Sequence, residues 1–275
     1  MSSETLFDAV ANRITVQEIA VKLFYVLPSY DGGDVGVASM EAMDENLTSD
    51  DIMDVGLVRD GDKLFGRIYT DMDDYAKAED VAKQITPSEM VAASTSILDL
   101  IPLFEKHNIF FVLDRNELTH WVAFAHLDKL PVKLCLFSLF LELELEMIRA
   151  LTNGSVVIGS HLGYLSQARL EKAKELCKIK YKKETPYNLL LCTTFIDKQT
   201  MIQADPYLCN KLPFPSRNSQ DRFFKTVEEM RNQIAHSDSI FSVINSPAEM
   251  SALIRKTRET LKVLSDIRNS GKGMQ

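Results

Sequence analysis

The 275-residue sequence has little of what marks a secreted, membrane-spanning or zinc-binding protein. It has four cysteines and one tryptophan. The cysteines are widely spaced and form no C-x-x-C pair, so we expect free thiols in a reducing, cytoplasmic setting. No apolar run reaches the ~18 residues of a membrane span, and the N-terminus lacks the basic cluster and apolar core of a secretion signal.

Several catalytic signatures are also missing. The sequence has no P-loop, no G-x-S-x-G and no H-E-x-x-H motif. Glu142, Glu144 and Glu146 lack the E-x-x-H partners of a di-iron bundle, and the histidines outside the last third of the chain have no metal-ligand spacing. We therefore expect no metal site.

The charge of the chain is divided unevenly along its length. The formal net charge is −8, but residues 1–150 carry −15 and residues 151–275 carry +7. Such asymmetry indicates two modules with different partners, because an acidic surface repels polyanions and a basic one attracts them.

The first half repeats one pattern of elements. A strand, a helix over 35–46 and a hairpin turning at Asp60-Gly61-Asp62 come first, followed by a helix over 74–84. A strand over 89–94, a helix over 97–108 and a hairpin turning at Asp114-Arg115-Asn116 then follow. Asp-Gly between β-rich runs is a strong hairpin signal. The recurrence after about 55 residues predicts an internal duplication.

The second half is helical in character. Residues 132–152 alternate partly with period two, but about twenty residues without Gly or Pro, rich in Leu, Glu and Met, favour a helix. Residues 153–160 read as a linker and 205–220, with three prolines, as an irregular loop. Ser246-Pro247-Ala248-Glu249 is a capping box that begins the last helix. The other helices are expected over 162–182, 187–204 and 221–236, which makes about five in all.

Two segments of the first half carry a family resemblance. They are Gly66-Arg67-Ile68-Tyr69-Thr70-Asp71-Met72-Asp73 and Val122-Ala123-Phe124-Ala125-His126-Leu127-Asp128. Each resembles the last strand of a CBS repeat, which commonly closes with Thr-x-x-Asp. The resemblance implies a CBS pair that binds an adenine nucleotide (AMP, ATP or S-adenosylmethionine) as a regulatory ligand. Thr70 and Asp73 would serve one cleft and Asp128 the other, each carboxylate accepting hydrogen bonds from ribose hydroxyls.

The second repeat departs from this pattern, because Ala125 stands where Thr is expected. The same residues also suit turns and helix caps, so a CBS pair that acts only as a scaffold stays open.

A second motif, Arg231-Asn232-Gln233-Ile234-Ala235-His236, lies in the basic half. Histidine can move a proton near neutral pH, and arginine can bind a phosphate bidentately. The motif resembles that of HEPN ribonucleases, which assemble a metal-independent RNA-cleaving site across a dimer. The resemblance implies that His236 is the general acid/base, Arg231 the phosphate ligand and Asn232 an assisting residue, in a homodimer acting on RNA.

The spacing alone is weakly specific. Arg115-Asn116-Glu117-Leu118-Thr119-His120 matches it too, but on an expected hairpin turn. Context favours the later copy, whose helix carries an apolar stripe of Phe223, Val227, Met230 and Ile234. Five helical steps place Arg231 and His236 about 140° apart, so they converge only past the helix end or between two chains. A helix C-terminal histidine favoured by the helix dipole is the structural alternative.

A basic run in the second half has two interpretations. It comprises Arg169, Lys172, Lys174, Lys178, Lys180, Lys182 and Lys183. Interleaved glutamates favour a solvated helix face, whereas an unpaired run would suit an RNA backbone. Only Tyr164 and Tyr181 lie nearby, so base stacking is not indicated.

The sequence therefore predicts an α+β protein in which tandem CBS repeats precede an all-α HEPN-like bundle. The expected divisions are an N-terminal segment 1–13, the CBS pair 14–130, the helical domain 131–270 and a tail 271–275. The leading hypothesis is a nucleotide-responsive endoribonuclease that needs no cofactor for catalysis. The alternative is a non-catalytic nucleotide sensor that dimerises through its helical domain and recruits a partner.

Overall fold

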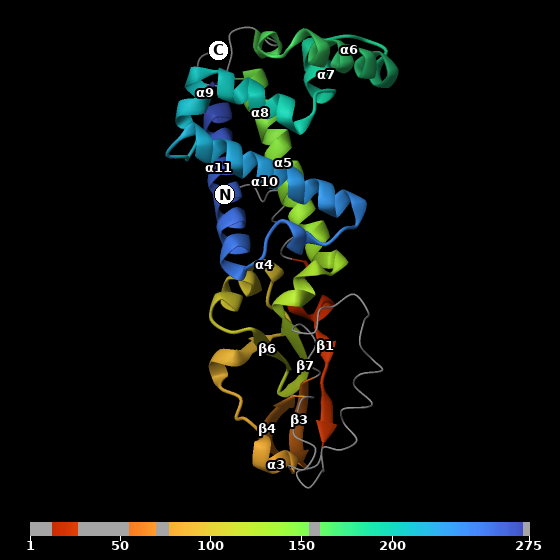
Figure 1. The fold of residues 1–275 in the computed structure, drawn as a ribbon, viewed down its shortest axis with the longest axis vertical. Helices are drawn as coiled ribbons and strands as arrows, with labels where there is room; N and C mark the ends of the chain where they lie inside the picture. The colour runs from red at the N-terminus through yellow and green to blue at the C-terminus, as the bar shows by residue number, and fades with distance from the viewer. Residues whose placement is uncertain (1–12, 27–54, 70–76, 154–159, 272–275) are drawn as a thin grey trace. The chain divides into compact units, whose positions relative to one another are not determined.

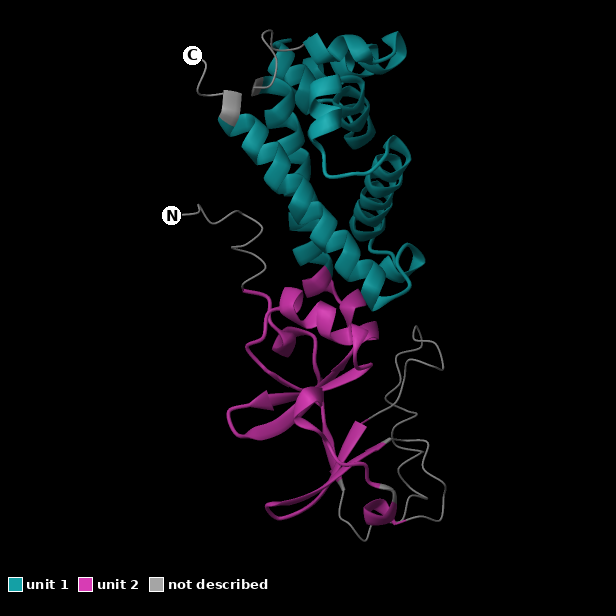
Figure 2. Cartoon of the chain, turned by 90° about the vertical axis from the view of Figure 1, so that its left-hand side faces the viewer, with its two compact units in different colours: residues 1–10, 133–275 teal, residues 11–132 magenta. Residues whose placement is uncertain are grey.

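The structure is a computed structural model that describes residues 13–26, 55–69, 77–153 and 160–271. It is a mixed α+β fold with two compact units. Among the described residues, those up to 132 form the first, here called the α/β unit, and those from 133 on form the second, here called the helical unit (Figure 2). None of the described helices is both long enough and apolar enough to span a membrane.

The α/β unit contains two small sheets. One sheet has four strands in the order β1 (Val21–Lys22), β7 (Glu117–Ala123), β6 (Ile109–Asp114) and β5 (Met90–Ala92). The other has three, in the order β2 (Phe24–Val26), β3 (Val55–Asp60) and β4 (Lys63–Tyr69).

The two sheets contain the same three-stranded motif. In each, a short strand pairs in parallel with the first strand of an antiparallel hairpin, as β2 does with β3 and β5 with β6. The hairpins share one register: Val55 pairs with Tyr69, and Ile109, 54 residues further on, pairs with Ala123. Both have a register shift at the same step, after Val58 and after Val112. Both predicted hairpins and their repetition are confirmed, whereas the expected helix over 35–46 lies outside the described residues.

The two repeats are also interlocked. β1, which precedes the first repeat's sheet strands, pairs with β7 of the second repeat, where Val21 lies opposite Trp121. Lys83, which precedes the second repeat, bridges to Arg67 on β4 of the first. Arg67 and Trp121 are 54 residues apart, which is the spacing of the duplication. The segment that crosses from one repeat to the other therefore pairs at the equivalent position on the second hairpin strand of each repeat. A core of Leu23, Val55, Leu57, Phe111 and Trp121 joins the sheets.

The helix predicted over 74–84 was too long. Within the described residues it is the single turn α3 (Ala78–Val81). Beyond it, Lys83 is extended, because its N–H and C=O both bond to the backbone of Arg67, at 2.9 and 2.8 Å. A long-range backbone pairing thus replaces the local helical bonds.

The helix predicted over 97–108 is present but tightens midway. Ser96 caps α4 (Ile97–Leu100) by accepting from the Asp99 N–H, and the chain continues as the 3₁₀ helix η4 (Ile101–Glu105). Pro102 lacks the N–H that α-helical continuation requires, which explains the change.

The helix α5 (Leu130–Asn153) begins three residues before the helical unit and forms its first helix, so the helix interpretation of this stretch is confirmed (Figure 1). The other long helices are α6 (Gln167–Tyr181), α8 (Phe195–Ala204), α10 (Arg217–His236) and α11 (Pro247–Gly271). The predicted Ser246 cap begins α11, where the Glu249 N–H donates to Ser246 Oγ, but the Glu249 carboxylate accepts from the Asn245 N–H instead of from that of Ser246 as the predicted capping box requires.

Two predictions for this unit were wrong. The helix over 187–204 is broken into α7 (Pro186–Leu191) and α8, because Thr194 and Asp197 cap each other's backbone N–H groups at 2.9 and 3.2 Å. The expected loop over 205–220 contains α9 (Pro206–Lys211), capped by Asp205, and the start of α10. The described part of this unit therefore has seven α-helices rather than five.

Candidate functional site

The Arg-x-x-x-x-His motif lies at the C-terminal end of α10. Ser216 caps this helix at its start, and the predicted stripe of Phe223, Val227 and Met230 is buried. The helix ends at His236, where Ser237 adopts a left-handed conformation (φ 63°) and the Asp238 N–H bonds to the Gln233 carbonyl at 2.9 Å. The motif is therefore helical throughout.

Arg231 faces its own unit rather than the solvent. Its Nη2 donates to Glu144 Oε2 of α5 at 2.5 Å, and both side chains are about four-fifths buried, with 19% and 18% exposed. Its guanidinium carbon lies 5.0 Å from the centre of the Phe195 ring on α8, a cation–π arrangement. Figure 1 shows α10 crossing α5 in this unit.

Glu144 bridges two cations. Its second oxygen, Oε1, lies 3.0 Å from Nζ of Lys198, which is only 1% exposed. Lys198 Nζ also donates to the Thr193 carbonyl at 2.5 Å, in the break between α7 and α8. Burial lowers the pKa of Lys198, and the Glu144 carboxylate opposes this shift. Arg231, Glu144 and Lys198 thus form one ion network, which also fastens the α7–α8 break to α5.

Further charges border this network. Arg169 of α6 pairs with Asp197 at 3.0 Å. Burial raises the pKa of Glu228, one turn before Arg231, although the Arg231 charge opposes that shift. Arg231 Nε is buried without a hydrogen-bond partner. The guanidinium is therefore held by one carboxylate and one ring, with part of its donor capacity unused.

The other two motif residues lie elsewhere on the helix. Asn232 and His236 are exposed. At about 100° per residue, the α-helical geometry through His236 keeps it about 140° from Arg231. The structure does not bring Arg231 and His236 together within one chain. No group of three or more His, Cys, Asp or Glu residues suited to a metal occurs in the part of the chain that the structure describes.

Of the residues expected to bind a nucleotide, only Asp128 lies among the described residues. It ends the 3₁₀ helix η5 (Phe124–Asp128) and is half-buried, whereas Thr70 and Asp73 lie outside the described residues. Three positions earlier, Ala125 offers no hydroxyl. The structure therefore describes the position of one of the three residues expected to bind a nucleotide, and the other two lie outside the described residues.

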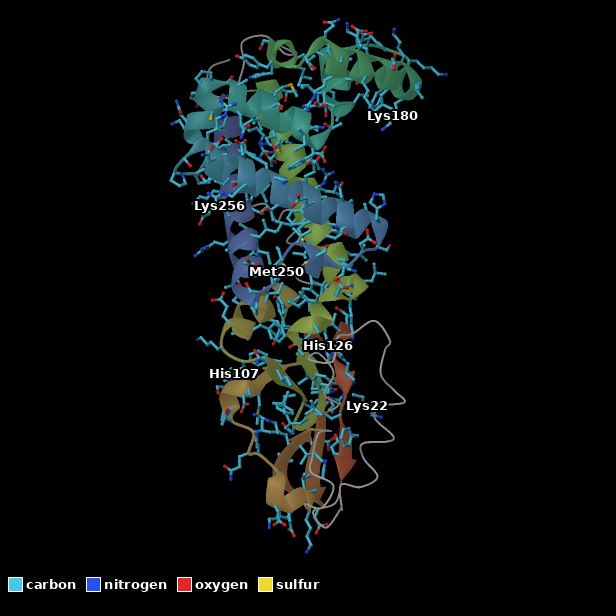
Figure 3. The ribbon with its side chains drawn as sticks, in the orientation of Figure 1. Lys22, His107, His126, Lys180, Met250 and Lys256 are labelled. Carbon is cyan, nitrogen blue, oxygen red and sulfur yellow. The ribbon has the colours of Figure 1, made fainter. Side chains whose placement is uncertain are left out.

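A buried histidine lies beside Asp128. His126, labelled in Figure 3, is 4.8 Å from the ring of Trp121, and its Nδ1 accepts from the Ala123 N–H at 3.2 Å. Burial lowers the pKa of His126 to about 3, and the nearby Lys129 charge adds to the effect. His126 is therefore neutral at physiological pH and closes the turn that presents Asp128.

Sequence reasoning missed the partners of Arg231. The sequence suggests no role for Glu144 beyond a candidate metal ligand, and it gives no signal for Lys198 or Phe195. No local pattern identifies them, because Glu144 lies 87 residues from Arg231. The buried pair of His161 and Asp205, 2.8 Å apart, was missed for the same reason.

The basic run is partly neutralised. Arg169 pairs with Asp197, and Lys174 pairs with Glu171 at 2.9 Å. Lys172, Lys178 and Lys180 are exposed on α6, and Figure 3 labels Lys180 near the end of that helix.

The second Arg-x-x-x-x-His string begins at Arg115 in the β6–β7 turn (φ 56°), as predicted.

Comparison with known proteins gives no relative: the chain matches no family model, no curated protein and no solved structure. Its function therefore has to be inferred from its own contacts.

Proposed function

We propose that the protein is a regulator whose α/β unit binds an adenine nucleotide and whose helical unit pairs with a second copy, without catalysing a reaction of its own. This is the non-catalytic alternative that the sequence left open. The single observation that carries it is the Glu144 carboxylate, which already neutralises the arginine of the candidate catalytic motif.

The ion network supports a structural role for Arg231. To bind a phosphate, the guanidinium would have to leave Glu144, and Glu144 would then retain only Lys198. Breaking a largely buried ion pair is unfavourable, because it leaves a charge in surroundings of low polarity. Arg231 is better suited to joining α10 to α5 than to stabilising charge on a substrate.

The duplication supports the sensor half of the proposal. The two repeats share strand order, hairpin register and the position at which a preceding segment pairs with the other repeat, which supports the duplication that the CBS resemblance implies. We propose that Asp128 binds the ribose of AMP, ATP or S-adenosylmethionine, with Thr70 and Asp73 serving the related cleft of the first repeat.

A metal-independent endoribonuclease is the second candidate. The exposure of Asn232 and His236 at the end of α10 favours it, because a general acid/base must reach its substrate. In this candidate, His236 would act opposite the Arg231 of a second chain, and RNA would be the substrate. Such a site forms only in a dimer.

One experiment separates the two candidates. Purified full-length protein and its His236→Ala variant are incubated with total RNA in chelator, with and without each adenine nucleotide. The regulator proposal expects no cleavage by either protein under any condition. Cleavage by the unmodified protein that the variant lacks would overturn it and establish the nuclease.

A further inference from the structure

Two of the four cysteines lie together in the helical unit. Cys177 on α6 is fully buried, Cys192 at the C-terminal end of α7 is 5% exposed, and both are free thiols. They are 15 residues apart in the sequence, but α6 and α7 pack against each other (Figure 1). The fold therefore brings together two thiols that lie on separate helices.

Hydrogen bonds to one carbonyl show how these helices meet. The Lys183 carbonyl, in the turn between α6 and α7, accepts from Cys177 Sγ at 3.6 Å and from Asn188 Nδ2 at 2.9 Å. The Cys192 N–H donates to the Asn188 carbonyl at 3.2 Å. Because residues four apart share one face of a helix, Cys192 lies on the face of α7 that is turned toward Cys177.

The two thiols also act on each other directly. Burial raises the pKa of Cys192, and the Cys177 thiol adds to this shift both electrostatically and through a hydrogen bond between the two side chains. The charges of Lys180 and Lys198 oppose the shift. A hydrogen bond between two thiols places their sulfur atoms next to each other, as formation of an S–S bond requires.

The other two cysteines have different surroundings. Cys135 is buried on α5, and burial raises the pKa of its thiol to about 11. Cys209 on α9 is half-buried and donates to Gln220 Oε1 at 3.5 Å. These two thiols therefore serve as controls within the same chain.

We propose that Cys177 and Cys192 form a reversible disulfide when the protein meets a peroxide, so that oxidation joins α6 covalently to the break between α7 and α8. This goes beyond the proposed function and depends on neither nucleotide binding nor pairing. Cys192 directly precedes Thr193, whose carbonyl accepts from Lys198 of the ion network. The disulfide would therefore anchor one end of that network to a further helix. In a reducing cytosol, disulfides of this kind are transient and serve redox sensing.

The oxidant is hydrogen peroxide, and the reaction balances in two steps. The Cys192 thiolate, the more exposed of the two, attacks one peroxide oxygen, the O–O bond breaks, and the released hydroxide takes up the proton lost by the thiol and leaves as water. The Cys177 thiol then attacks the sulfur of the Cys192 sulfenic acid, the S–O bond breaks, and a second water leaves with the Cys177 proton. Both sulfur atoms are oxidised and both peroxide oxygens are reduced.

The reaction should be slow at neutral pH. Burial raises the pKa of Cys192, so little of the reactive thiolate is present there. Formation of the disulfide should therefore be faster at about pH 9 than at about pH 7.

Peptide mapping without reduction tests the disulfide itself. The full-length protein is treated with hydrogen peroxide, its remaining thiols are alkylated in denaturant, and it is digested with trypsin. We expect residues 175–178 to be linked to residues 184–198, and dithiothreitol to release them. Cys135 and Cys209 should be recovered as alkylated thiols. Recovery of Cys177 and Cys192 in separate peptides after peroxide treatment, or a link to either of the other two cysteines, would overturn the proposal.

Thermal unfolding measures the consequence of the disulfide. A disulfide that closes a loop of about 15 residues stabilises a protein mainly by restricting its unfolded chain, so peroxide should raise the unfolding midpoint of the unmodified protein by at least about 3 °C. Cys192→Ala should show no such rise, whereas Cys209→Ala, the matched control, should respond as the unmodified protein does.

Each variant is compared with its own reduced form, so a loss of stability caused by the substitution itself does not affect the result. An equal rise in Cys192→Ala and in the unmodified protein, or no rise in the unmodified protein, would contradict the proposal.

Discussion

The role of Arg231 depends on its neighbours more than on its motif. The sequence places an arginine five positions before a histidine, which suits phosphate chemistry. The structure gives that arginine a carboxylate and an aromatic ring inside its own unit, while His236 remains exposed. Substitutions of Arg231 and of His236 are therefore expected to differ sharply in their effect on the free energy of unfolding.

Arg231→Ala should lower the free energy of unfolding by about 2 kcal/mol, since it leaves Glu144 short of a partner at a site that solvent only partly reaches. His236→Ala should change it by no more than about 0.5 kcal/mol, as usual for an exposed position. Urea unfolding followed by circular dichroism measures both. Equal, negligible effects would show that the ion pair contributes nothing to stability.

His126 should make stability depend on pH in a defined window. Its pKa falls from 6.5 to about 3 on folding, so the unfolded chain binds more protons between those values. The contribution of neutral His126 is complete above pH 6.5 and is lost as the pH falls toward 3, by about 1.4 kcal/mol per pH unit.

Comparing unfolding free energies at pH 7 and pH 5 isolates this effect. The fall should be smaller in His126→Gln than in the unmodified protein. His236→Gln, at an exposed position, serves as the control and should follow the unmodified protein. A difference between pH 7 and pH 5 that is the same in all three would contradict the assignment.

At the scale of elements, the stability of the α/β unit depends on the backbone bridge by which Lys83, ahead of the second repeat, pairs with Arg67 of the first. Gly66 has a φ of 153°, and a Cβ there would lie 2.5 Å from the Lys83 carbonyl oxygen, which bonds to the Arg67 N–H. Gly61, in the β3–β4 turn, also has a positive φ of 56°, but nothing lies within 4 Å of its Cβ position.

Gly66→Ala should therefore cost more stability than Gly61→Ala. The turn substitution carries only backbone strain of about 1 kcal/mol, whereas Gly66→Ala also displaces the Lys83 backbone. Chemical unfolding of the two variants compares them directly. An equal loss would mean that the Arg67–Lys83 bridge can move aside freely.

The elements that could be predicted are those defined by local chemistry. The two hairpins follow from Asp60-Gly61 and Asp114-Arg115 between β-rich runs, and α11 follows from its Ser246 cap. The elements that could not be predicted depend on contacts outside their own local sequence pattern. Lys83 is extended because of Arg67, and α7 ends before a reciprocal cap at Thr194. The neutralisation of Arg231 by Glu144, across 87 residues, belongs to the same class.

At the scale of the whole molecule, one chain contains a duplicated α/β unit and a helical unit with the ion network of Arg231, Glu144 and Lys198. The proposed regulator requires that the first unit bind a ligand. A ligand that binds only the folded chain at 100 times its dissociation constant stabilises it by about 2.7 kcal/mol, which a thermal shift can detect.

Calorimetric titration of the full-length protein with AMP, ATP and S-adenosylmethionine tests that requirement most directly. We expect at least one of the three to bind, and Asp128→Asn to weaken that binding about tenfold or more by removing a charged acceptor of the ribose hydroxyls. Asp114→Asn, at the exposed β6–β7 turn of the same repeat, should bind as the unmodified protein does. Absence of binding by all three ligands, or binding unaffected by the Asp128 substitution, would contradict the account.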